Sequence, residues 1–173
     1  EIESEILQIA EPFSAVLDLL YTLPGLDKNP MTAIAILSEI GPDMSVFPSS
    51  KHLVSWAGCC PRNDQSNQKV KSRRISRAGS YLKPLLVQVA NALIKSKKHP
   101  EFKERYHRIK SRRGHKKAII AVCKMLLTAI WNMLSKLEPY NPEGFLEHRP
   151  VTQEKTLTVS QALELLRLRG YTI

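Results

Sequence analysis

Apolar residues recur along this chain at intervals of three and four, which is the spacing of helices with one buried face. In residues 30–40, Ala33, Ile34, Leu37 and Ile40 form such a stripe, with Pro30 at its start and Gly41-Pro42 after its end. Proline commonly opens a helix and glycine commonly follows one. The same signals predict further helices over residues 49–56, 80–96, 100–110, 115–137 and 160–169.

Strand-like alternation is scarce. Residues 59–75 are polar and basic and predict a loop or a hairpin, to which Lys69 to Ile75 can contribute a short strand. The fold class is therefore mainly α, a multi-helix domain with a helix-hairpin-helix-like element near its N-terminus and a short loop or hairpin insertion. Ser80 and Ser160 are the expected caps of the helices that they precede.

The first helical segment, residues 1–21, has a different character. Its apolar residues alternate in steps of four and three, as in a heptad seam, so it is either the end of a coiled coil or an amphipathic helix that packs on the domain. Pro12 predicts a break, because proline in mid-helix removes a hydrogen bond and clashes with the preceding turn. The seam consists of Ile2, Ile6, Ile9, Phe13, Val16 and Leu20.

Three regions follow from this pattern: a coiled-coil end or linker helix over residues 1–21, a main domain over 22–137, and a C-terminal extension with one helix over 138–173. The chain has 173 residues and begins at Glu1 rather than Met. We interpret it as a fragment of a longer protein.

Composition excludes several classes of protein. Hydrophobic residues make up 43% and charged residues 24% of the chain, which is typical of a globular domain. No apolar run reaches the ~18 residues needed to cross a bilayer, and no signal-peptide pattern opens the chain. The three cysteines, Cys59, Cys60 and Cys123, form neither a disulfide framework nor a zinc motif. An intracellular, reducing setting without a membrane fits best.

The charge is concentrated in the middle of the chain. Residues 69–117 contain 17 basic and 2 acidic residues, whereas the formal net charge of the whole chain is only +10. A basic block between mildly acidic ends is typical of proteins that bind a polyanion, most often nucleic acid. A solvated face without a partner is the simpler alternative.

Three short segments are candidates for nucleic-acid chemistry. The first is the turn Leu23-Pro24-Gly25-Leu26 between two amphipathic segments. In a helix-hairpin-helix, glycine lets the backbone approach a phosphate, and the N–H groups that open the second helix point at the anion. Pro24, Gly25 and Leu26 are the candidate contacts, although Pro-Gly turns also end helices in proteins that bind nothing.

The second segment is the polar loop around Ser66. A hydroxyl among cations is a plausible nucleophile for a phosphodiester, because positive charge stabilises the oxyanion that develops at phosphorus. Ser66 is also a common type of turn residue. The cations that surround it in the sequence are Arg62, Lys69, Lys71, Arg73, Arg74 and Arg77.

The third segment, residues 110–117, joins two predicted helices around Gly114. Its cations suggest a phosphate clamp, or else a solubilising connection: Lys110, Arg112, Arg113, Lys116 and Lys117. The histidines show no spacing that suits a metal. Cys123, Trp56 and Trp131 are interpreted as packing residues.

The order of these pieces resembles the C-terminal domain of the IS-one-ten group of insertion-sequence transposases, which is related to the Piv-type DNA invertases. The resemblance covers roughly residues 17–137. It is carried by Leu23-Pro24-Gly25-Leu26, Leu37-Ser38-Glu39-Ile40-Gly41, Phe47-Pro48-Ser49-Ser50-Lys51-His52-Leu53, Trp56-Ala57-Gly58, Pro61-Arg62, Gln65-Ser66-Asn67, Ile75-Ser76-Arg77-Ala78-Gly79-Ser80-Tyr81-Leu82 and Lys116-Lys117-Ala118-Ile119.

The resemblance implies a bacterial, cytoplasmic, DNA-associated recombinase of two parts. An N-terminal RuvC-like domain with four acidic residues would bind divalent metal (Mg), a coiled coil would follow, and the C-terminal domain would supply a serine that becomes joined to DNA. Members are guided by a structured RNA and act as oligomers. By position the serine falls on Ser66, and the acidic domain is missing here, so the isolated chain is expected to be inactive and to hold no metal.

This chain departs from the family pattern at two other points. Asn67 stands where members usually have glycine, and Cys59-Cys60 replaces a small apolar pair. Asparagine tolerates left-handed backbone better than other non-glycine residues, so the turn can survive. Two other functions stay open on the residues alone: a non-catalytic helix-hairpin-helix module that grips nucleic-acid backbone, and a helical interaction protein with a solvated basic face.

Overall fold

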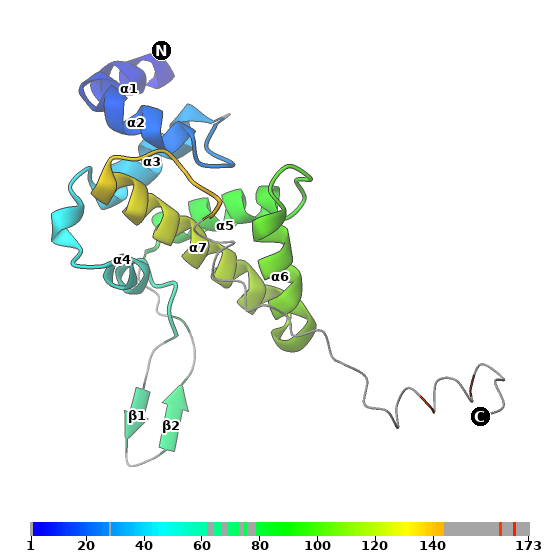
Figure 1. Ribbon diagram of the computed structural model, residues 1–173. Coiled ribbons are helices and arrows are strands. Elements are labelled where there is room, and N and C mark those ends of the chain that lie inside the picture. The colour runs from blue at the N-terminus through cyan, green and yellow to red at the C-terminus, as the bar shows by residue number, and fades with distance from the viewer. Residues whose placement is uncertain are drawn as a thin grey trace. The chain divides into compact units, whose positions relative to one another are not determined.

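The computed structural model describes residues 2–27, 29–61, 64–66, 69–72, 75, 79–143, 163 and 168, with residues 64–66 and 69–72 described as backbone. The chain divides into two compact units, residues 1–141 and residues 142–173. The first unit is mainly helical, as predicted, and carries every candidate segment (Figure 1). The helix predicted over 160–169 lies outside the described residues, apart from Leu163 and Leu168.

The N-terminal segment is broken where Pro12 predicts it. Helix α1 (Ile2–Ala10) ends in a 3-10 turn, η1 (Glu11–Phe13), and α2 (Ser14–Tyr21) follows. Only the C-terminal part of the heptad seam packs on the domain: Leu20 is fully buried, whereas Ile2 and Ile9 are each 74% exposed.

Helix α3 (Pro30–Ile40) has the predicted bounds. The side chain of Asn29 caps it by accepting a hydrogen bond from the backbone N–H of Thr32, at 3.2 Å. A short 3-10 turn, η2 (Met44–Val46), leads to α4 (Ser50–Trp56). Ser49 precedes α4, but its hydroxyl bonds the Nδ1 of His52 rather than a backbone N–H.

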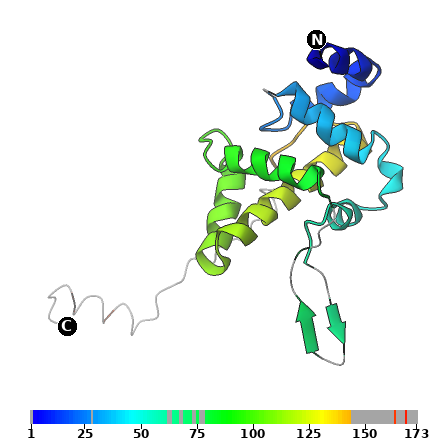
Figure 2. The ribbon, with the colours of Figure 1, turned by 180° about the vertical axis from the view of Figure 1, so that it is seen from behind.

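The insertion between α4 and α5 (Leu82–Leu93) contains a two-stranded antiparallel hairpin, β1 (Asp64–Ser66) and β2 (Lys69–Ser72). The hairpin alternative for residues 59–75 is therefore confirmed. In both views the strands extend away from the helices (Figures 1 and 2). The cap predicted at Ser80 is wrong, because Tyr81 directly precedes α5 and no side chain caps it.

Two long helices complete the unit. Helix α6 (Pro100–Arg113) extends three residues beyond its predicted end, and α7 (His115–Lys136) runs through the core, in contact with α2, α4, α5 and α6 (Figure 1). The indole N–H of Trp131 on α7 donates to the carbonyl of Phe47, at 2.9 Å, which ties the segment before α4 to the central helix.

Among the described residues, α7 is long and apolar enough by composition to cross a membrane, although no uninterrupted apolar run in the chain has that length. More than half of its apolar stretch is buried inside the protein. Cys123, Leu126, Leu127 and Ile130 are among the buried residues. Burial of this kind is expected of a helix at the centre of a packed core, which explains its hydrophobicity without a bilayer.

Candidate nucleic-acid interface

The hairpin brings the candidate nucleophile opposite a candidate cation. Ser66 is the last residue of β1 and pairs with Lys69, the first residue of β2. The register shifts between Asp64 and Gln65, whose partners are Ser72 and Val70, so Lys71 is the extra residue of a bulge. The backbone thus sets Ser66, Lys69 and Lys71 in one short ribbon. The other predicted cations of this segment, Arg62, Arg73, Arg74 and Arg77, lie outside the described residues.

A close backbone contact holds the two ends of the insertion together. A β-carbon on Gly79 would lie only 2.5 Å from the carbonyl oxygen of Ala57, the residue after α4. Gly79 also has a positive φ of 66°. Only glycine meets both demands without strain. Beyond this contact, Pro61 and Ile75 form an isolated antiparallel bridge, so the insertion leaves and re-enters the helical unit through one narrow base.

The second group of predicted cations gathers at the corner between α6 and α7. Lys110, Arg112 and Arg113 lie in the last turn of α6, and Lys116 and Lys117 lie in the first turn of α7. All five side chains are exposed. Gly114 is the single residue between the helices and has a φ of 80°. The structure therefore brings together the cations of residues 110–117 as the sequence predicts.

Tyr106 anchors this corner from inside. Its ring is buried, and its hydroxyl lies 2.8 Å from Nδ1 of His115, the first residue of α7. The ammonium group of Lys110 lies 5.4 Å from the centre of the same ring, in cation–π geometry. One aromatic side chain thus contacts both helices that carry the cations.

Positive charge accumulates along α6 itself. Burial and the neighbouring Arg108 guanidinium lower the pKa of Arg105. Lys103 and His107 are exposed on the same helix. Like charges that crowd one another on a rigid surface are stabilised when a polyanion approaches. These exposed cations of α6 are therefore suited to phosphate groups, and Lys103, Arg105 and Arg108 are additions to the candidates that the sequence predicts.

The Leu23–Leu26 turn also has a structural role. Leu23 and Leu26 are at most 1% exposed, and Pro24 is buried. Gly25 has a φ of 87°, and a β-carbon there would lie 2.8 Å from Cγ1 of Val89. The backbone approaches helix α5 closely, which gives Gly25 a packing role in addition to the predicted one. The phosphate contacts expected of Pro24, Gly25 and Leu26 stay a prediction.

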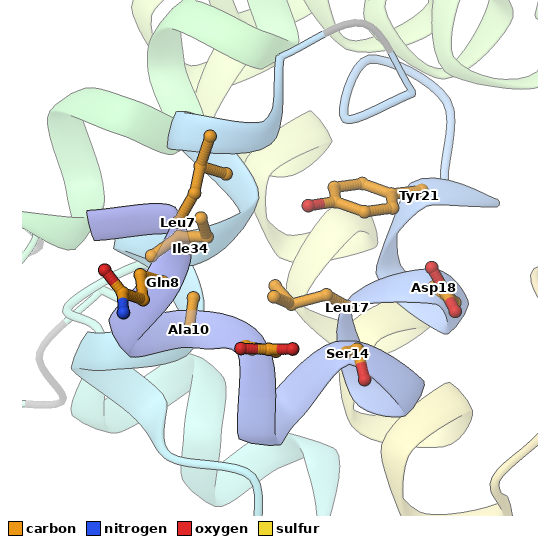
Figure 3. Close-up of a pocket in the computed structure, with 9 residues that line it drawn as sticks. Leu7, Gln8, Ala10, Ser14, Leu17, Asp18, Tyr21 and Ile34 are labelled. Atoms are coloured by element: carbon orange, nitrogen blue, oxygen red, sulfur yellow. The ribbon is translucent and has the colours of Figure 1, made fainter. Parts of the chain in front are cut away.

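A cavity of about 400 Å³ lies elsewhere, among α1, α2 and α3 (Figure 3). Its lining is mostly apolar, with Leu7, Leu17 and Ile34, and includes the acidic Glu11 and Asp18. Carboxylates repel phosphate, so this cavity does not suit the predicted substrate. Among the residues that the structure describes, no group of three or more His, Cys, Asp or Glu side chains is placed to hold a metal.

Two features of the structure were not found by sequence reasoning. Trp56, interpreted as a packing residue, is 46% exposed, and Tyr81 is 75% exposed. Both flank the base of the hairpin insertion.

The second feature is a contact of the segment after α7. Tyr140 donates a hydrogen bond to the buried Glu101, at 3.0 Å, and its ring stacks on Phe102. Neither feature corresponds to a periodic pattern of residues in the sequence, because each depends on a contact between segments far apart in the chain.

Residues 17–107 match the family described as the IS116/IS110/IS902 family of transposases. The chain belongs to this transposase family. The match runs from α2 into α6 and so includes the hairpin with Ser66, whereas the whole corner at residues 110–117 lies beyond it.

Individual relatives of the chain agree with its membership of this transposase family. It is 30% identical over 125 residues to the pilin gene-inverting protein of Moraxella bovis, an alignment that covers 71% of this chain and 38% of that protein. It is 29% identical over 122 residues to the transposase for insertion sequence element IS1111A of Coxiella burnetii, covering 69% of this chain and 33% of that protein. The chain thus spans less than two fifths of these relatives. No solved structure matches it.

Proposed function

We propose that this chain is the serine-bearing, DNA-binding part of a transposase or DNA invertase, and that Ser66 attacks a phosphodiester during strand exchange. The observation that carries the proposal is the position of Ser66 at the end of β1, opposite Lys69, within an insertion that extends from the helices. The family membership supports DNA as the substrate, since the relatives are named for transposition and gene inversion.

In the proposed step, the Ser66 oxygen forms a bond to phosphorus while one ester bond of the DNA strand breaks. The serine loses its proton, and the departing sugar oxygen leaves with a proton. The product is a serine–phosphate ester that conserves the energy of the broken bond and can be reversed by a hydroxyl of the new partner strand.

The cations of the insertion have a defined part in this step. Directly opposite residues of an antiparallel pair are neighbours on one face of the ribbon, so Lys69 is the nearest expected counter-charge for the phosphate at Ser66. Arg62, Lys71, Arg73, Arg74 and Arg77 add positive charge to the same insertion. Charge of this sign stabilises the pentavalent phosphorus, which carries more negative charge than the starting diester.

The corner cations, Lys110, Arg112, Arg113, Lys116 and Lys117, bind the DNA backbone away from the reacting phosphate. Contacts to phosphates position a duplex without reading its sequence. The rigid α6–α7 corner, with Tyr106 tied to His115, holds these side chains at a constant distance from the helical core.

The remaining parts of the enzyme belong to the longer protein. A divalent metal (Mg), held by the acidic N-terminal domain that the family resemblance implies, would supply charge stabilisation at the second reacting oxygen. Oligomerisation and a structured guide RNA are further elements of the proposal. The isolated chain is accordingly proposed to bind DNA and to be inactive in strand exchange.

The test uses the full-length transposase with its donor and target DNA and scores covalent protein–DNA adducts after denaturation. The Ser66→Ala variant is expected to form none, and Ser38→Ala, which changes an exposed serine on α3, is the matched control. Adducts at the wild-type level with Ser66→Ala would assign the nucleophile elsewhere, with Ser72, Ser76 and Ser80 as the next candidates.

A further inference from the structure

Exposed aromatic rings are unevenly distributed over the surface that the structure describes. Trp56 is 46% exposed and Tyr81 75% exposed, and together with Phe13 on η1 they are the large exposed aromatic side chains among the described residues. Single exposed apolar residues are ordinary. Here, however, two of them flank the same insertion, the one that carries Ser66.

The backbone explains why these two residues are brought to one place. Trp56 ends α4 and directly precedes Ala57, and Tyr81 follows Gly79 by two residues. Gly79 packs against the carbonyl of Ala57 with no room for a β-carbon. The two segments, more than twenty residues apart in the chain, therefore meet at the base of the insertion. Trp56 stands directly before the contact in the first segment, and Tyr81 stands two residues after it in the second.

Trp56 is also held in position. The ring of Phe47 packs edge-on against it, with centroids 5.6 Å apart and an interplanar angle of 61°. The carbonyl of Phe47 in turn accepts the hydrogen bond from Trp131 of the central helix. A ring that is fixed from one side and exposed to solvent loses little conformational freedom when a second ring stacks on it.

The charge next to these rings selects the ligand. Between Pro61 and Gly79 the sequence contains six basic residues and one acidic residue. A cationic segment with exposed aromatic rings is the combination by which proteins hold single-stranded nucleic acid, since cations follow the backbone and rings stack on bases. At the α6–α7 corner, by contrast, the aromatic side chain of Tyr106 is buried, which leaves phosphate contacts alone.

We propose that Trp56 and Tyr81 form a stacking platform for unpaired bases at the root of the Ser66 hairpin. The proposal rests on the proposed function, because it assigns to the same site the form of nucleic acid that it accepts. Bases stacked on Trp56 and Tyr81 are removed from their duplex, so the adjoining phosphodiester reaches the hairpin as a single strand. The corner cations then hold the paired part.

The test compares two fluorescent strands of on the order of 20 units, one of thymidine nucleotides and one of abasic sugars with the same number of phosphates, in binding to the 173-residue chain. Wild type is expected to bind the thymidine strand more tightly. Tyr81→Ala and Trp56→Ala are each expected to weaken that affinity by about 5- to 150-fold and to leave the abasic strand unchanged.

Controls separate stacking from a structural effect. Tyr81→Phe keeps a ring and is expected to bind as wild type. Leu7→Ala removes an apolar side chain on α1, away from the insertion, that is as exposed as Trp56, and it is also expected to bind as wild type. Quenching of tryptophan fluorescence by the thymidine strand is expected to be largely lost in Trp56→Phe, because Trp131 is half-buried.

Three results would overturn the platform while leaving DNA binding in place. The first is equal affinity of the wild type for the thymidine and abasic strands, and the second is wild-type affinity of both alanine variants for the thymidine strand. The third is an alanine variant whose affinity for the abasic strand or for a duplex falls as much as its affinity for the thymidine strand. If wild type retains neither strand nor duplex at ~0.1 M salt, the nucleic-acid binding in the proposed function fails, and the platform fails with it. If Trp56→Ala does not fold, Tyr81→Ala decides, since its side chain is the more exposed.

Discussion

The hydroxyl of Tyr140 donates a hydrogen bond to Oε1 of Glu101, at 3.0 Å, across 39 residues of sequence. The backbone N–H of Tyr140 donates to the hydroxyl of Thr22, at 2.9 Å. Residues from the segment after α7 thus connect the start of α6 with the end of α2. Tyr140 thus links two helices that are far apart in the sequence.

This contact predicts a loss of stability at alkaline pH. Burial, and then the negative Glu101, raise the pKa of Tyr140 above its usual value near 10. Above pH ~10 the unfolded chain loses the tyrosine proton while the folded chain keeps it, so the free energy of unfolding falls as pH rises. In Tyr140→Phe this part of the decrease is expected to disappear.

Tyr140→Phe also removes the hydroxyl that bonds the Glu101 carboxylate. At neutral pH it is expected to lower the free energy of unfolding by about 1–3 kcal/mol. Urea titrations at pH 7 and at pH 10.5 (~25 °C) measure both effects. If the free energy of unfolding depends on pH equally in wild type and in Tyr140→Phe, the loss of stability does not come from Tyr140.

Four glycines with a positive φ form a series that differs in the space beside each of them. Gly25, Gly41, Gly79 and Gly114 all have φ between 66° and 87°. An added β-carbon meets nothing within 4 Å at Gly41 and Gly114, but lies 2.8 Å from the Val89 side chain at Gly25 and 2.5 Å from a backbone carbonyl at Gly79.

Alanine at Gly41 or Gly114, where ψ is 164° and 170°, is therefore expected to cost only the strain of a backbone region that is essentially restricted to glycine, about 1–3 kcal/mol. Gly25→Ala is expected to cost about 1–3 kcal/mol more because the core must repack. Gly79→Ala is expected to be the most destabilising, because a backbone carbonyl yields less than a side chain. Thermal or urea unfolding of the four variants gives the order, and equal losses at all four positions would refute the packing roles.

The three cysteines are expected to differ in reactivity. Burial, the largest cause in each case, raises the pKa of the Cys59 thiol to about 11 and that of Cys123 to about 12. At pH 8 only about one Cys59 in a thousand is a thiolate, the form that reacts. Cys60 is half-buried. A thiol reagent should label one cysteine rapidly in the folded protein and all three in denaturant, with peptide mapping to identify Cys60 as the first.

The corner cations are expected to act through phosphate contacts. Lys116→Gln and Lys117→Gln should each reduce the slope of log affinity against log salt by about 0.9 on duplex DNA, whatever its sequence. Lys136→Gln removes an exposed lysine from the last turn of the same helix and serves as the control. Identical slopes for the corner variants and the control would exclude the corner from the interface.

Most of the helical framework follows from local sequence signals. Pro30 and Gly41 bound α3 as expected, Pro12 interrupts the first helix, and the polar insertion forms a hairpin. These signals are local, because proline, glycine and the spacing of apolar residues act on the backbone within a few positions. The family was also recognisable from the residues, since several motifs stand in the same order, whereas the role of Ser66 stays a prediction.

Long-range contacts decide what the local pattern cannot. The Pro24-Gly25 turn has the residues of a phosphate-binding loop, yet α5, some sixty residues later, packs Val89 against its glycine and gives the turn a role in the core. Trp56 was interpreted as a core residue, yet it stays exposed because α4 ends beside Gly79 and the hairpin leaves the helices there. The identity of a residue determines which contacts it can make, whereas the tertiary structure decides whether protein or solvent occupies the space beside it.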